Sequence, residues 1–566
     1  MRQGLSENLI ARVLGSAPKY TIAQLEEIYP PRVLPDGAMV TRFAPSPTGF
    51  MHIGNLYGAL IDKKLAQQSD GVFYLRIEDT DTEREVSGAV ELIMGTQAEF
   101  GLFADEGPVF DEPYNWRDNG DYGPYFQSQR KDIYHSVAAE LLATGRAYPC
   151  FLSSGEMDEI RAEQKAAGVP TGIYGEWAKW RNATDDEIGA RLDANEIPTI
   201  RLYSTGDKNK KIFCKDAVRG SIAFPENDND IVLIKSNDRL PTYHFAHLVD
   251  DHFMRTTHVV RSDEWLPSFP LHIQMFSMMV ELFTNYSWAP PAYIHTSTLD
   301  TIDSETGKQR KLSKRKDPEA NVDYFVKKGY PSWAVLDYLL NIISSGYEGE
   351  RAKTPKLMWD EYQINIKKIP TSGALFDWKK MEWWSRENIA LLSAEELYDN
   401  IKRWNDGGII PMTTRKTGNN ITTGYSRQVS PKTLFVIENK DDLIKIFGIE
   451  RENVDNPKRI RKDFVTWKQT LEEVAYFFDD LFAKSGDEIN KDALREFLGS
   501  YDSKDPKDLW WEKIIAVAAK LGIKNGDVAM ALRIALTGRT NAPDLYSVMQ
   551  VMGDVRVRTR IEQCLK

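Results

Sequence analysis

Cysteine is scarce in this chain, and long hydrophobic runs are missing. The 566 residues include three cysteines, Cys150, Cys214 and Cys564, and none of them forms a Cys-x-x-Cys pair. This number and spacing exclude a disulfide framework and a zinc knuckle. The apolar stretch at 271–280 is shorter than the roughly 18 residues that span a bilayer, and residues 1–10 lack the apolar segment of a secretory signal. The sequence therefore predicts a cytoplasmic protein with no membrane partner.

A basic net charge is also missing, because the formal charge is -11 at pH 7. The charge is unevenly distributed, however. Residues 1–300 contain 28 Lys and Arg against 43 Asp and Glu, whereas residues 301–566 contain 44 against 40. A nucleic-acid partner needs a local basic track rather than a basic whole protein. This asymmetry permits an RNA partner in the second half without requiring one.

The start of the chain predicts a βαβ unit behind an appended arm. Residues 1–36 are typical of a helical arm that ends in a proline-rich stretch. The apolar run at 39–44 breaks into a turn at 45–49, and helical spacing at 54–68 leads to a second apolar run at 71–79. A strand, a glycine-bearing loop, a helix and a strand in this order predict a parallel sheet. At this length the chain is expected to form three or more domains.

The middle of the chain reads as an insertion in this first fold. Residues 129–240 alternate helical stretches with short strands. A strand pattern at 258–265 and a helical pattern at 271–283 then indicate that the first fold resumes.

Amphipathic helical stretches dominate from about residue 386, and 466–485 is one of the longest. The segment 406–429 is polar and rich in glycine and threonine, which predicts a loop or an insertion.

Residues 42–55 form the first motif, Arg-Phe-Ala-Pro-Ser-Pro-Thr-Gly-Phe-Met-His-Ile-Gly-Asn. A strand that ends in a sharp turn, with glycines that admit the backbone closely and a helix N-terminus behind them, is typical of a nucleotide site. His52 and Gly54 are placed where a triphosphate would lie. Taken alone, a single His-x-Gly is weak evidence, because a lone histidine is more often structural.

The second motif is the basic run Lys-Leu-Ser-Lys-Arg-Lys at 311–316. Several cations on one loop can neutralise the charge that grows on a leaving pyrophosphate. Taken alone, the run is more often a solvated charged loop.

Together the two motifs resemble the HIGH and KMSKS signatures of class I aminoacyl-tRNA synthetases, in the wording of the bacterial-type glutamyl-tRNA synthetases. Further segments continue this resemblance in the family's order: 75–81, 123–128, 241–246, 249–252 and 260–265. It is strong over roughly 39–345 and resumes faintly at 531–558, which is similar to the end of the family's helical anticodon-binding region.

The resemblance implies an α/β fold, with a Rossmann-like class I synthetase catalytic domain that carries an α+β insertion and is followed by an all-helical C-terminal anticodon-binding region. The expected domains are an N-terminal helical extension at 1–36, the two halves of the catalytic domain at 37–128 and 241–300, an acceptor-binding insertion at 129–240, a connecting domain with the KLSKR loop at 301–385, and the helical region at 386–566.

The resemblance also implies the site residues. The glutamate-binding set is Arg42, Ala44, Ser46, Glu78, Tyr243, His247 and Arg261. The ATP-binding set is His52, Gly54, Asn55, Glu264, Lys311, Ser313 and Lys314, in which His52 and Lys314 are the catalytic residues.

Each role fits the chemistry of its residue type. A carboxylate is bound best by a bidentate guanidinium, so Arg42 and Arg261 are expected around the substrate glutamate, although the sequence does not say which of them reads the γ-carboxylate. Glu78 would accept the α-ammonium; its alternative is a solvated acidic turn with Asp79 and Asp81. Glu264 would hold the ribose.

Three departures from the family wording stand out. Asn55 replaces the second histidine of the HIGH signature, which leaves more of that role to His52. His247 stands where the best-known members have asparagine, so its substrate contact is open. Cys150 has no partner for the zinc site that some members carry in the insertion, so no structural zinc is expected.

The expected reaction joins L-glutamate to the 3′ end of tRNA-Glu through glutamyl-adenylate, with ATP and Mg²⁺ as a substrate complex, in a monomer. Whether tRNA-Gln is also charged stays open. The nearest alternative is a glutaminyl-tRNA synthetase, against which the wording of 44–49 and the helical C-terminus argue. The length argues against a tRNA-modifying glutamyl-queuosine relative and a small nucleotidylyltransferase, and the intact signatures argue against an inactive RNA-binding paralogue.

Overall fold

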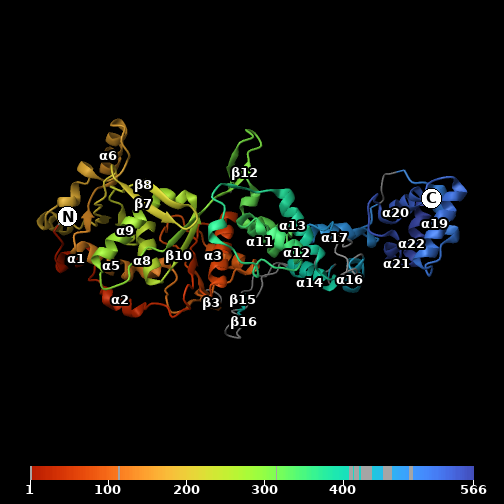
Figure 1. The fold of residues 1–566 in the computed structure, drawn as a ribbon, viewed down its shortest axis with the longest axis horizontal. Coiled ribbons are helices and arrows are strands. Elements are labelled where there is room, and N and C mark those ends of the chain that lie inside the picture. The colour runs from red at the N-terminus through yellow and green to blue at the C-terminus, as the bar shows by residue number, and fades with distance from the viewer. Residues whose placement is uncertain are drawn as a thin grey trace. The chain divides into compact units, whose positions relative to one another are not determined.

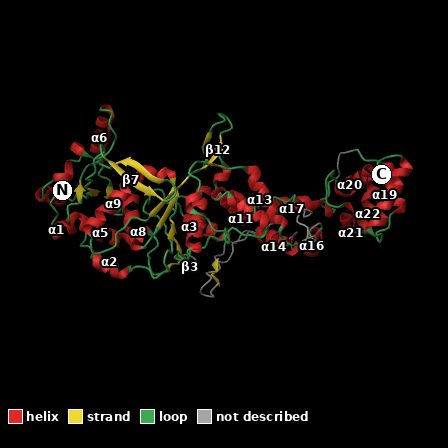
Figure 2. Cartoon of the chain, in the orientation of Figure 1, coloured by secondary structure: helices red, strands yellow, loops and turns green. Residues whose placement is uncertain are grey.

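A computed structural model describes residues 3–112, 115–313, 315–406, 412–413, 420–421, 436, 438–449, 451, 462–483 and 488–566. The chain forms two compact units. The first unit comprises Met1–Asp323, Leu339–Phe376 and Pro411–Thr423, and the second comprises Tyr324–Tyr338, Asp377–Ile410 and Gly424–Lys566. Figure 1 labels their helices and strands, and Figure 2 shows that the strands belong mainly to the N-terminal part of the chain and that helices make up the C-terminal part.

The predicted βαβ unit is confirmed. It consists of β1 (Val40–Phe43), α3 (Ile53–Gln68) and β2 (Val72–Leu75). The two strands are parallel, with Val40 opposite Val72 and Phe43 opposite Leu75. Every residue of β1 is buried, as expected of a strand with both faces covered. The motif between β1 and α3 therefore lies at the carboxyl end of the sheet, where ligands bind in open α/β folds.

The second half of the fold comes from a separate sheet, in which β10 (His258–Ser262) and β11 (Ala292–Thr296) are parallel and place Arg261 opposite His295. The first half joins it directly after a long excursion of the chain. Thr257 donates its backbone N–H to the carbonyl of Val40 over 3.0 Å, and its hydroxyl accepts from the Val40 N–H over 2.7 Å. Two segments separated by 217 residues therefore form one site.

One pairing was not predicted from the sequence. β7 (Lys211–Asp216) forms a hairpin with β8 (Gly220–Pro225) and also pairs with β11, with Asp216 opposite Tyr293. The hairpin brings Asp216 to the edge of the strand that carries His295. Nothing in the local pattern of 211–225 distinguishes this from pairing within the insertion.

The rest of the insertion forms a sheet of its own, in which β6 (Thr199–Leu202) lies between β5 (Ala147–Cys150) and β9 (Val232–Ile234). Its helices are α5 (Lys131–Ala143), α6 (Ser154–Ala166) and α7 (Asp185–Asp193). Both α6 and α7 begin with a capping box, in which Ser153 pairs with Glu156 and Thr184 pairs with Glu187.

The N-terminal arm contains α1 (Glu7–Leu14) and α2 (Ile22–Ile28), as predicted. Its apolar side chains belong to the same core as those of α5 and of α8 (Tyr243–Phe253). Arg32 binds both carboxylate oxygens of Glu106, at 2.6 and 2.9 Å, and Glu26 lies 2.6 Å from Arg255 and 2.7 Å from His252 on α8. The arm is therefore an integral part of the first unit.

The first unit also contains α4 (Ala89–Glu99), the hairpin of β3 (Gly107–Glu112) and β4 (Asn115–Asn119), α9 (Phe269–Leu282), the small sheet of β12 (Leu299–Ile302), β13 (Gln309–Lys311) and β14 (Ala374–Leu375), and α12 (Gly346–Lys353). Two further helices, α10 (Val322–Lys328) and α11 (Ser332–Ile343), are divided between the units.

The described residues of the second unit form helices around a core of their own. These are α13 (Trp378–Ala390), α14 (Ala394–Asn405), α16 (Lys440–Gly448), α17 (Trp467–Val474), α18 (Lys491–Ser500), α19 (Lys507–Leu521), α20 (Asn525–Thr537), α21 (Leu545–Met552) and α22 (Asp554–Leu565). Within the described part of the chain, each helix is too short or too polar to cross a membrane.

One helix prediction was wrong in its length. The amphipathic stretch at 466–485 is helical as α17 only to Val474, and a single 3₁₀ turn, Ala475–Phe477, follows. Tyr476 and Phe477 are both buried. The change from an α-helix to a 3₁₀ turn thus coincides with the burial of these two rings. Of the loop predicted at 406–429, only 406 and the short pair β15 (Met412–Thr413) and β16 (Asn420–Ile421) lie among the described residues.

Candidate active site

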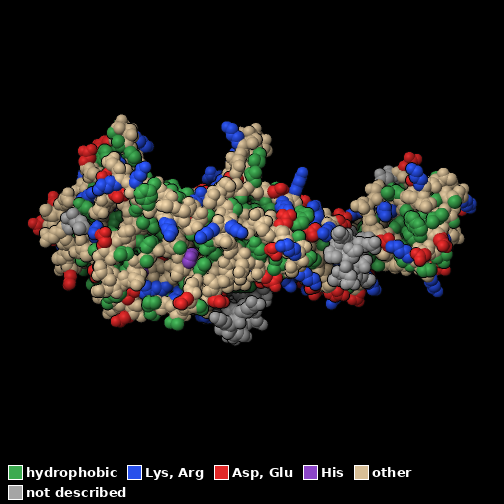
Figure 3. Space-filling view, in the orientation of Figure 1, with side chains coloured by type: hydrophobic (Ala, Val, Ile, Leu, Met, Phe, Trp, Pro, Cys, Tyr) green, Lys and Arg blue, Asp and Glu red, His purple; other side chains and the backbone are tan. Residues whose placement is uncertain are grey.

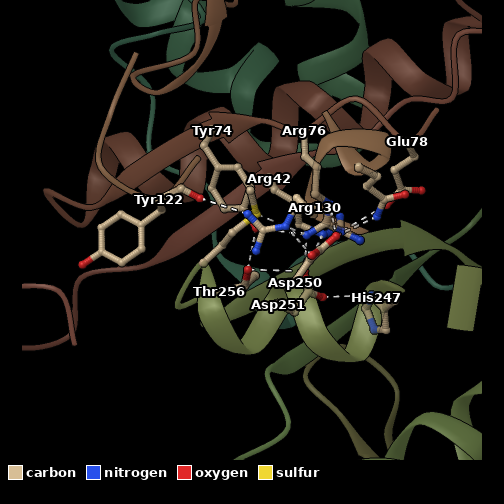
Figure 4. A network of polar contacts seen from close by, with 12 residues as sticks. Arg42, Tyr74, Arg76, Glu78, Tyr122, Arg130, His247, Asp250, Asp251 and Thr256 are labelled. Atoms are coloured by element: carbon tan, nitrogen blue, oxygen red, sulfur yellow. Dashed lines mark hydrogen bonds and ion pairs between the residues drawn. The ribbon is translucent and has the colours of Figure 1, made fainter. Parts of the chain in front are cut away.

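Two aspartates on α8 anchor a buried network of charges below the carboxyl end of the sheet. Asp251 Oδ1 accepts from Arg76 Nη1 over 2.7 Å, and Asp250 Oδ1 accepts from Arg130 Nε over 2.6 Å. Arg76 also donates from Nη2 to Glu78 over 3.0 Å. Figure 4 shows the two aspartates reaching from α8 toward the arginines. All of these side chains are buried, so their charges compensate one another inside the protein.

Arg42, at the end of β1, lies at the edge of this network. Its Nη1 donates to the carbonyl of Val260 over 3.2 Å, and its Nε lies 3.9 Å from Asp251. Burial disfavours the charged guanidinium, but Asp251, Asp62 and Tyr243 together oppose this effect, and the pKa of Arg42 stays above its usual value. The Nε is buried without a hydrogen-bond partner among the described atoms. Arg42 therefore keeps part of its donor capacity for another group.

Glu78 follows β2 and faces the same region. Its side chain is buried, which excludes the solvated acidic turn as its setting. Burial raises the pKa of Glu78, and the cations Arg76 and Arg42 oppose this shift. Its backbone N–H donates to the carbonyl of Pro45 over 3.0 Å, which holds the loop of Ala44 and Ser46 beside it. Ser46 is exposed, and Ala44 is half-buried.

Tyr243, in the first turn of α8, connects the two halves of the site. Burial raises the pKa of its hydroxyl, while Arg261 and Arg42 lower it and Glu78 raises it further. The structure therefore brings together the predicted Arg42, Glu78, Tyr243 and Arg261. The ring of Tyr243 also lies 4.4 Å from that of Trp265, centroid to centroid. Trp265 belongs to a segment that carries the resemblance, but no role was predicted for it.

His247 lies one turn further along α8 and is fully buried. Its Nδ1 lies 2.9 Å from Asp251 Oδ2, and its Nε2 lies 2.9 Å from the hydroxyl of Tyr293. The His247 ring stacks with Tyr243 at 5.8 Å between centroids. Both ring nitrogens thus lie against protein groups, and only the ring face is directed to a predicted substrate-binding residue.

Arg261 has surroundings of a different kind. Its Nε donates to His295 Nε2 over 2.9 Å, and its Nη1 lies 3.0 Å from His272 Nδ1. Its guanidinium carbon lies 4.7 Å from the ring centroid of Tyr293, a cation–π contact. His272, His295 and Tyr293 were missed in the sequence. Only the register of β10 and β11 and the packing of α9 bring them to Arg261.

The nucleotide side of the site is built at the start of α3. His52 is the N-cap residue, and its Nδ1 accepts from the backbone N–H of Gly54 over 2.9 Å. Its Nε2 must then carry the ring proton, which it donates to the carbonyl of Leu312 over 3.2 Å. Gly54 and Asn55 lie in the first turn of α3, where the helix favours a negative charge.

The second motif is held by its own hairpin. Lys311 ends β13, and its ammonium lies 2.5 Å from the carboxylate of Glu264. Ser313 donates its backbone N–H to Asp317 over 2.8 Å, and Arg310 binds both oxygens of Asp317. Lys314, the predicted catalytic lysine, lies outside the described residues. The other predicted ATP-binding residues of this segment are thus brought to the side of His52.

The described residues contain no group of three or more His, Cys, Asp or Glu side chains arranged to hold a metal ion. Cys150 and Cys214 are buried free thiols. On the face drawn in Figure 3, basic and acidic side chains are interspersed. The predicted site residues thus offer the buried guanidinium groups of Arg42 and Arg261, the buried carboxylate of Glu78 and the N-terminus of α3.

Comparisons with known proteins agree along the chain. The family model for the catalytic domain of class I tRNA synthetases (E and Q) matches residues 38–383, and a model for an anticodon binding domain matches residues 453–565. The glutamate–tRNA ligase of Acetivibrio thermocellus is 42% identical over 561 residues, which cover 95% of this chain and 96% of that one. The glutamate–tRNA ligase of Clostridium perfringens strain 13 is 40% identical, with coverage of 98% and 99%.

A solved structure is similar over nearly the same length. It is the glutamate tRNA ligase of Elizabethkingia meningosepticum in complex with its amino acid, at 27% identity and a TM-score of 0.71. The match covers 93% of this chain and 99% of that one.

Proposed function

Because this chain belongs to the glutamate–tRNA ligase family of class I tRNA synthetases, we propose that it activates L-glutamate with ATP and transfers it to the 3′ end of tRNA-Glu. Family membership confirms the predicted enzyme class and the fold class of an α/β catalytic domain followed by a helical anticodon-binding region. The observation that carries the proposal is the contact of the two signature motifs, in which His52 Nε2 lies 3.2 Å from the carbonyl of Leu312.

In the first step, an oxygen of the substrate α-carboxylate attacks the α-phosphorus of ATP, and pyrophosphate leaves. In the second step, a terminal hydroxyl of the tRNA attacks the carbonyl carbon of the mixed anhydride, and AMP leaves. Neither step needs a covalent bond to the enzyme. The protein supplies positioning and charge stabilisation, as in other phosphoryl transfers.

The roles proposed for the glutamate-binding residues follow from their surroundings. Arg42 and Arg261 take the two substrate carboxylates, and Glu78 accepts the α-ammonium. Tyr243 lies beside them. His247 lies against Asp251 and Tyr293, so we assign it to the support of Tyr243 through ring stacking. Ala44 and Ser46 line the entry beside Glu78.

The nucleotide is assigned to the start of α3 and to the second motif. His52 donates to the phosphate, Gly54 and Asn55 border the phosphates at the helix N-terminus, and Glu264 holds the ribose. Lys311, Ser313 and Lys314 take the triphosphate. Mg²⁺ enters as part of the ATP substrate complex, and the proposal includes no structural zinc. We further propose that the enzyme acts as a cytoplasmic monomer.

The domain boundaries proposed from the sequence assign the tRNA to two regions. The insertion at 129–240 receives the acceptor end and the helical region at 386–566 receives the anticodon, with the connecting domain at 301–385 between them in sequence. The match of 453–565 to an anticodon binding domain supports the second assignment.

The decisive experiment is glutamate-dependent ATP–pyrophosphate exchange with and without tRNA-Glu. Because tRNA is generally needed for the activation step in this family, we expect exchange only in its presence. Robust exchange without RNA would contradict the coupling, and no exchange in either case would overturn the proposed function. Charging assays with purified tRNA-Glu and tRNA-Gln decide whether the second tRNA is also a substrate.

A further inference from the structure

Four of the chain's eight histidines gather around the guanidinium of Arg261. His272 and His295 contact its nitrogens directly. His244 and His247 lie behind His272, at 5.2 and 4.5 Å between ring centroids. His247, His272 and His295 are buried and come from α8, α9 and β11. The roles assigned above leave His244, His272 and His295 of this cluster without a function.

The hydrogen bonds fix the proton on His295. Asp216 Oδ2 lies 2.7 Å from His295 Nδ1, so the ring proton is on Nδ1. The bare Nε2 then accepts from Arg261 Nε. Asp216 is itself saturated, because its two oxygens also accept the backbone N–H groups of Val218, Arg219 and His295. A continuous series of hydrogen bonds therefore connects the hairpin of β7 and β8, through Asp216 and His295, to Arg261.

His272 is fixed in the same way from the other side. Its Nδ1 accepts from Arg261 Nη1, so its Nε2 carries the proton and donates to His244 Nδ1 over 2.9 Å. Each histidine thus presents an uncharged acceptor to the guanidinium. Together they bind Nε and one Nη1 hydrogen, and they determine the plane in which the guanidinium lies.

These partners differ in charge from those of the neighbouring arginines. Arg76 binds Asp251 and Glu78, and Arg130 binds Asp250, so the positive charge of each is compensated within the protein. No carboxylate among the described residues lies within 4.0 Å of the Arg261 nitrogens. Its Nη2 is buried and has no hydrogen-bond partner in the described structure. Arg261 is therefore a buried, oriented cation with an unused donor edge.

We propose that His272 and His295 are positioning residues that orient Arg261 without neutralising it, so that its Nη2 edge stays available for a carboxylate of the substrate. This inference rests on the proposed function, because it concerns how the same site binds glutamate. A carboxylate in place of either imidazole would orient the guanidinium equally well. It would also neutralise the positive charge of Arg261, which has to remain uncompensated in order to attract a carboxylate of the substrate.

Burial keeps both imidazoles in the neutral state that this role requires. It lowers the pKa of His272 well below its usual value, and the nearby His247, Arg261, His244 and His295 act in the same direction. The pKa of His295 is lowered by burial, and Asp216 opposes this shift whereas Arg261 and Arg219 add to it.

A matched pair of variants tests the proposal. In His272→Asn the side-chain oxygen can replace Nδ1 as a neutral acceptor, and His272→Asp has the same shape with a negative charge. For glutamate in the tRNA-dependent exchange assay, we expect KM to rise less than about threefold in the first variant and about 30-fold or more in the second, the size of one charge-assisted contact. The KM for ATP should stay within a factor of about two in both, because the proposed function assigns ATP to residues other than Arg261.

Each outcome decides the matter. Equal effects of the two variants on the KM for glutamate would overturn the proposal, because a structural role depends on shape and not on charge. Melting temperatures that fall while the KM for glutamate stays constant would overturn it as well. If His272→Asp does not fold, the pair His295→Gln and His295→Glu makes the same comparison at Arg261 Nε. A wild-type enzyme without glutamate-dependent exchange would instead refute the proposed function itself.

Discussion

The ammonium of Lys311 lies 2.5 Å from the carboxylate of Glu264, so two residues proposed to bind different parts of ATP bind each other in the structure. Both side chains are about half exposed, at 45% and 54%. An exposed pair of this kind contributes about 0–1 kcal/mol to stability. The ion pair of Lys311 and Glu264 holds the second motif beside the nucleotide site, and little free energy is needed to break it. ATP must break this pair in order to bind both residues.

Lys311→Met should therefore affect ATP and leave the fold unchanged. We expect KM for ATP to rise about tenfold, because the triphosphate loses one charge-assisted contact, with no measurable change in melting temperature. Lys308→Met is the matched control, since Lys308 is an exposed lysine on the same hairpin. Equal KM values for the two variants would show that Lys311 has no specific contact with ATP.

His52 has two separable functions, because its Nδ1 caps α3 and its Nε2 faces Leu312. His52→Asn keeps a capping side chain but removes the Nε2 donor. We expect a loss of about 10²- to 10³-fold in kcat for exchange, typical of one transition-state donor, with a nearly unchanged melting temperature.

His52→Gln makes the complementary change, since its amide can reach the Nε2 position but glutamine is a poor N-cap. It should retain more activity than His52→Asn and melt at a lower temperature. The opposite order of activities would assign the catalytic effect to the helix cap rather than to the donor.

Arg261 and its partners show which residues of the site could be predicted from the sequence and which could not. The resemblance places Arg42, Glu78, Tyr243 and Arg261 around the substrate, because the motifs that carry them are local and specific in wording. His272, His295 and Asp216 do not belong to any motif that assigns them to the site. His295 and His272 reach Arg261 because β11 aligns in register with β10 and α9 packs nearby, and Asp216 reaches His295 because β7 joins the same sheet. These are long-range pairings that no local pattern encodes.

The fold divides in the same way. The βαβ unit, the arm and the C-terminal helices follow from hydrophobic periodicity. The early end of α17 does not, because the amphipathic pattern continues past Val474, where the chain changes to a 3₁₀ turn with Tyr476 and Phe477 buried.

The buried network around α8 predicts a large difference between two arginines. Arg76→Met leaves Asp251 and Glu78 buried without their main cation, and removal of one partner from such a network costs about 3–5 kcal/mol. Arg84→Gln is the control, because Arg84 pairs with Asp81 at the surface and is 75% exposed. Chemical denaturation should show this loss for Arg76→Met and less than about 1 kcal/mol for Arg84→Gln. Similar losses in both variants would contradict the structural role of the network.

Histidine burial makes stability depend on pH. Burial lowers the pKa of both His244 and His247 to about 4. The unfolded chain takes up these protons from about pH 6.5 downward, whereas the folded protein does not until about pH 4. Stability is therefore full above about pH 7 and falls between these values, by on the order of 3 kcal/mol for each histidine.

Melting temperatures measured from pH 7.5 to pH 5 check this dependence. The wild-type protein should lose stability more steeply than His247→Gln, which has one fewer buried histidine to protonate on unfolding. Parallel curves for the two proteins would show that His247 does not contribute to the acid sensitivity.

The contact of β1 with Thr257, the residue before β10, also bears on how the chain folds during its synthesis. Val40 and its partner Thr257 are 217 residues apart, which at about 5–20 residues per second is roughly 10–40 s of translation. Throughout that interval the nascent β1 has an unpaired edge, and Arg42 lacks its contacts with the carbonyl of Val260 and with Asp251. The arm and the insertion emerge first and can fold onto each other, but the catalytic sheet is completed only when β10 and β11 have left the ribosome. A pause in translation between these segments would prolong the exposure of an aggregation-prone strand edge, whereas one after β11 would not.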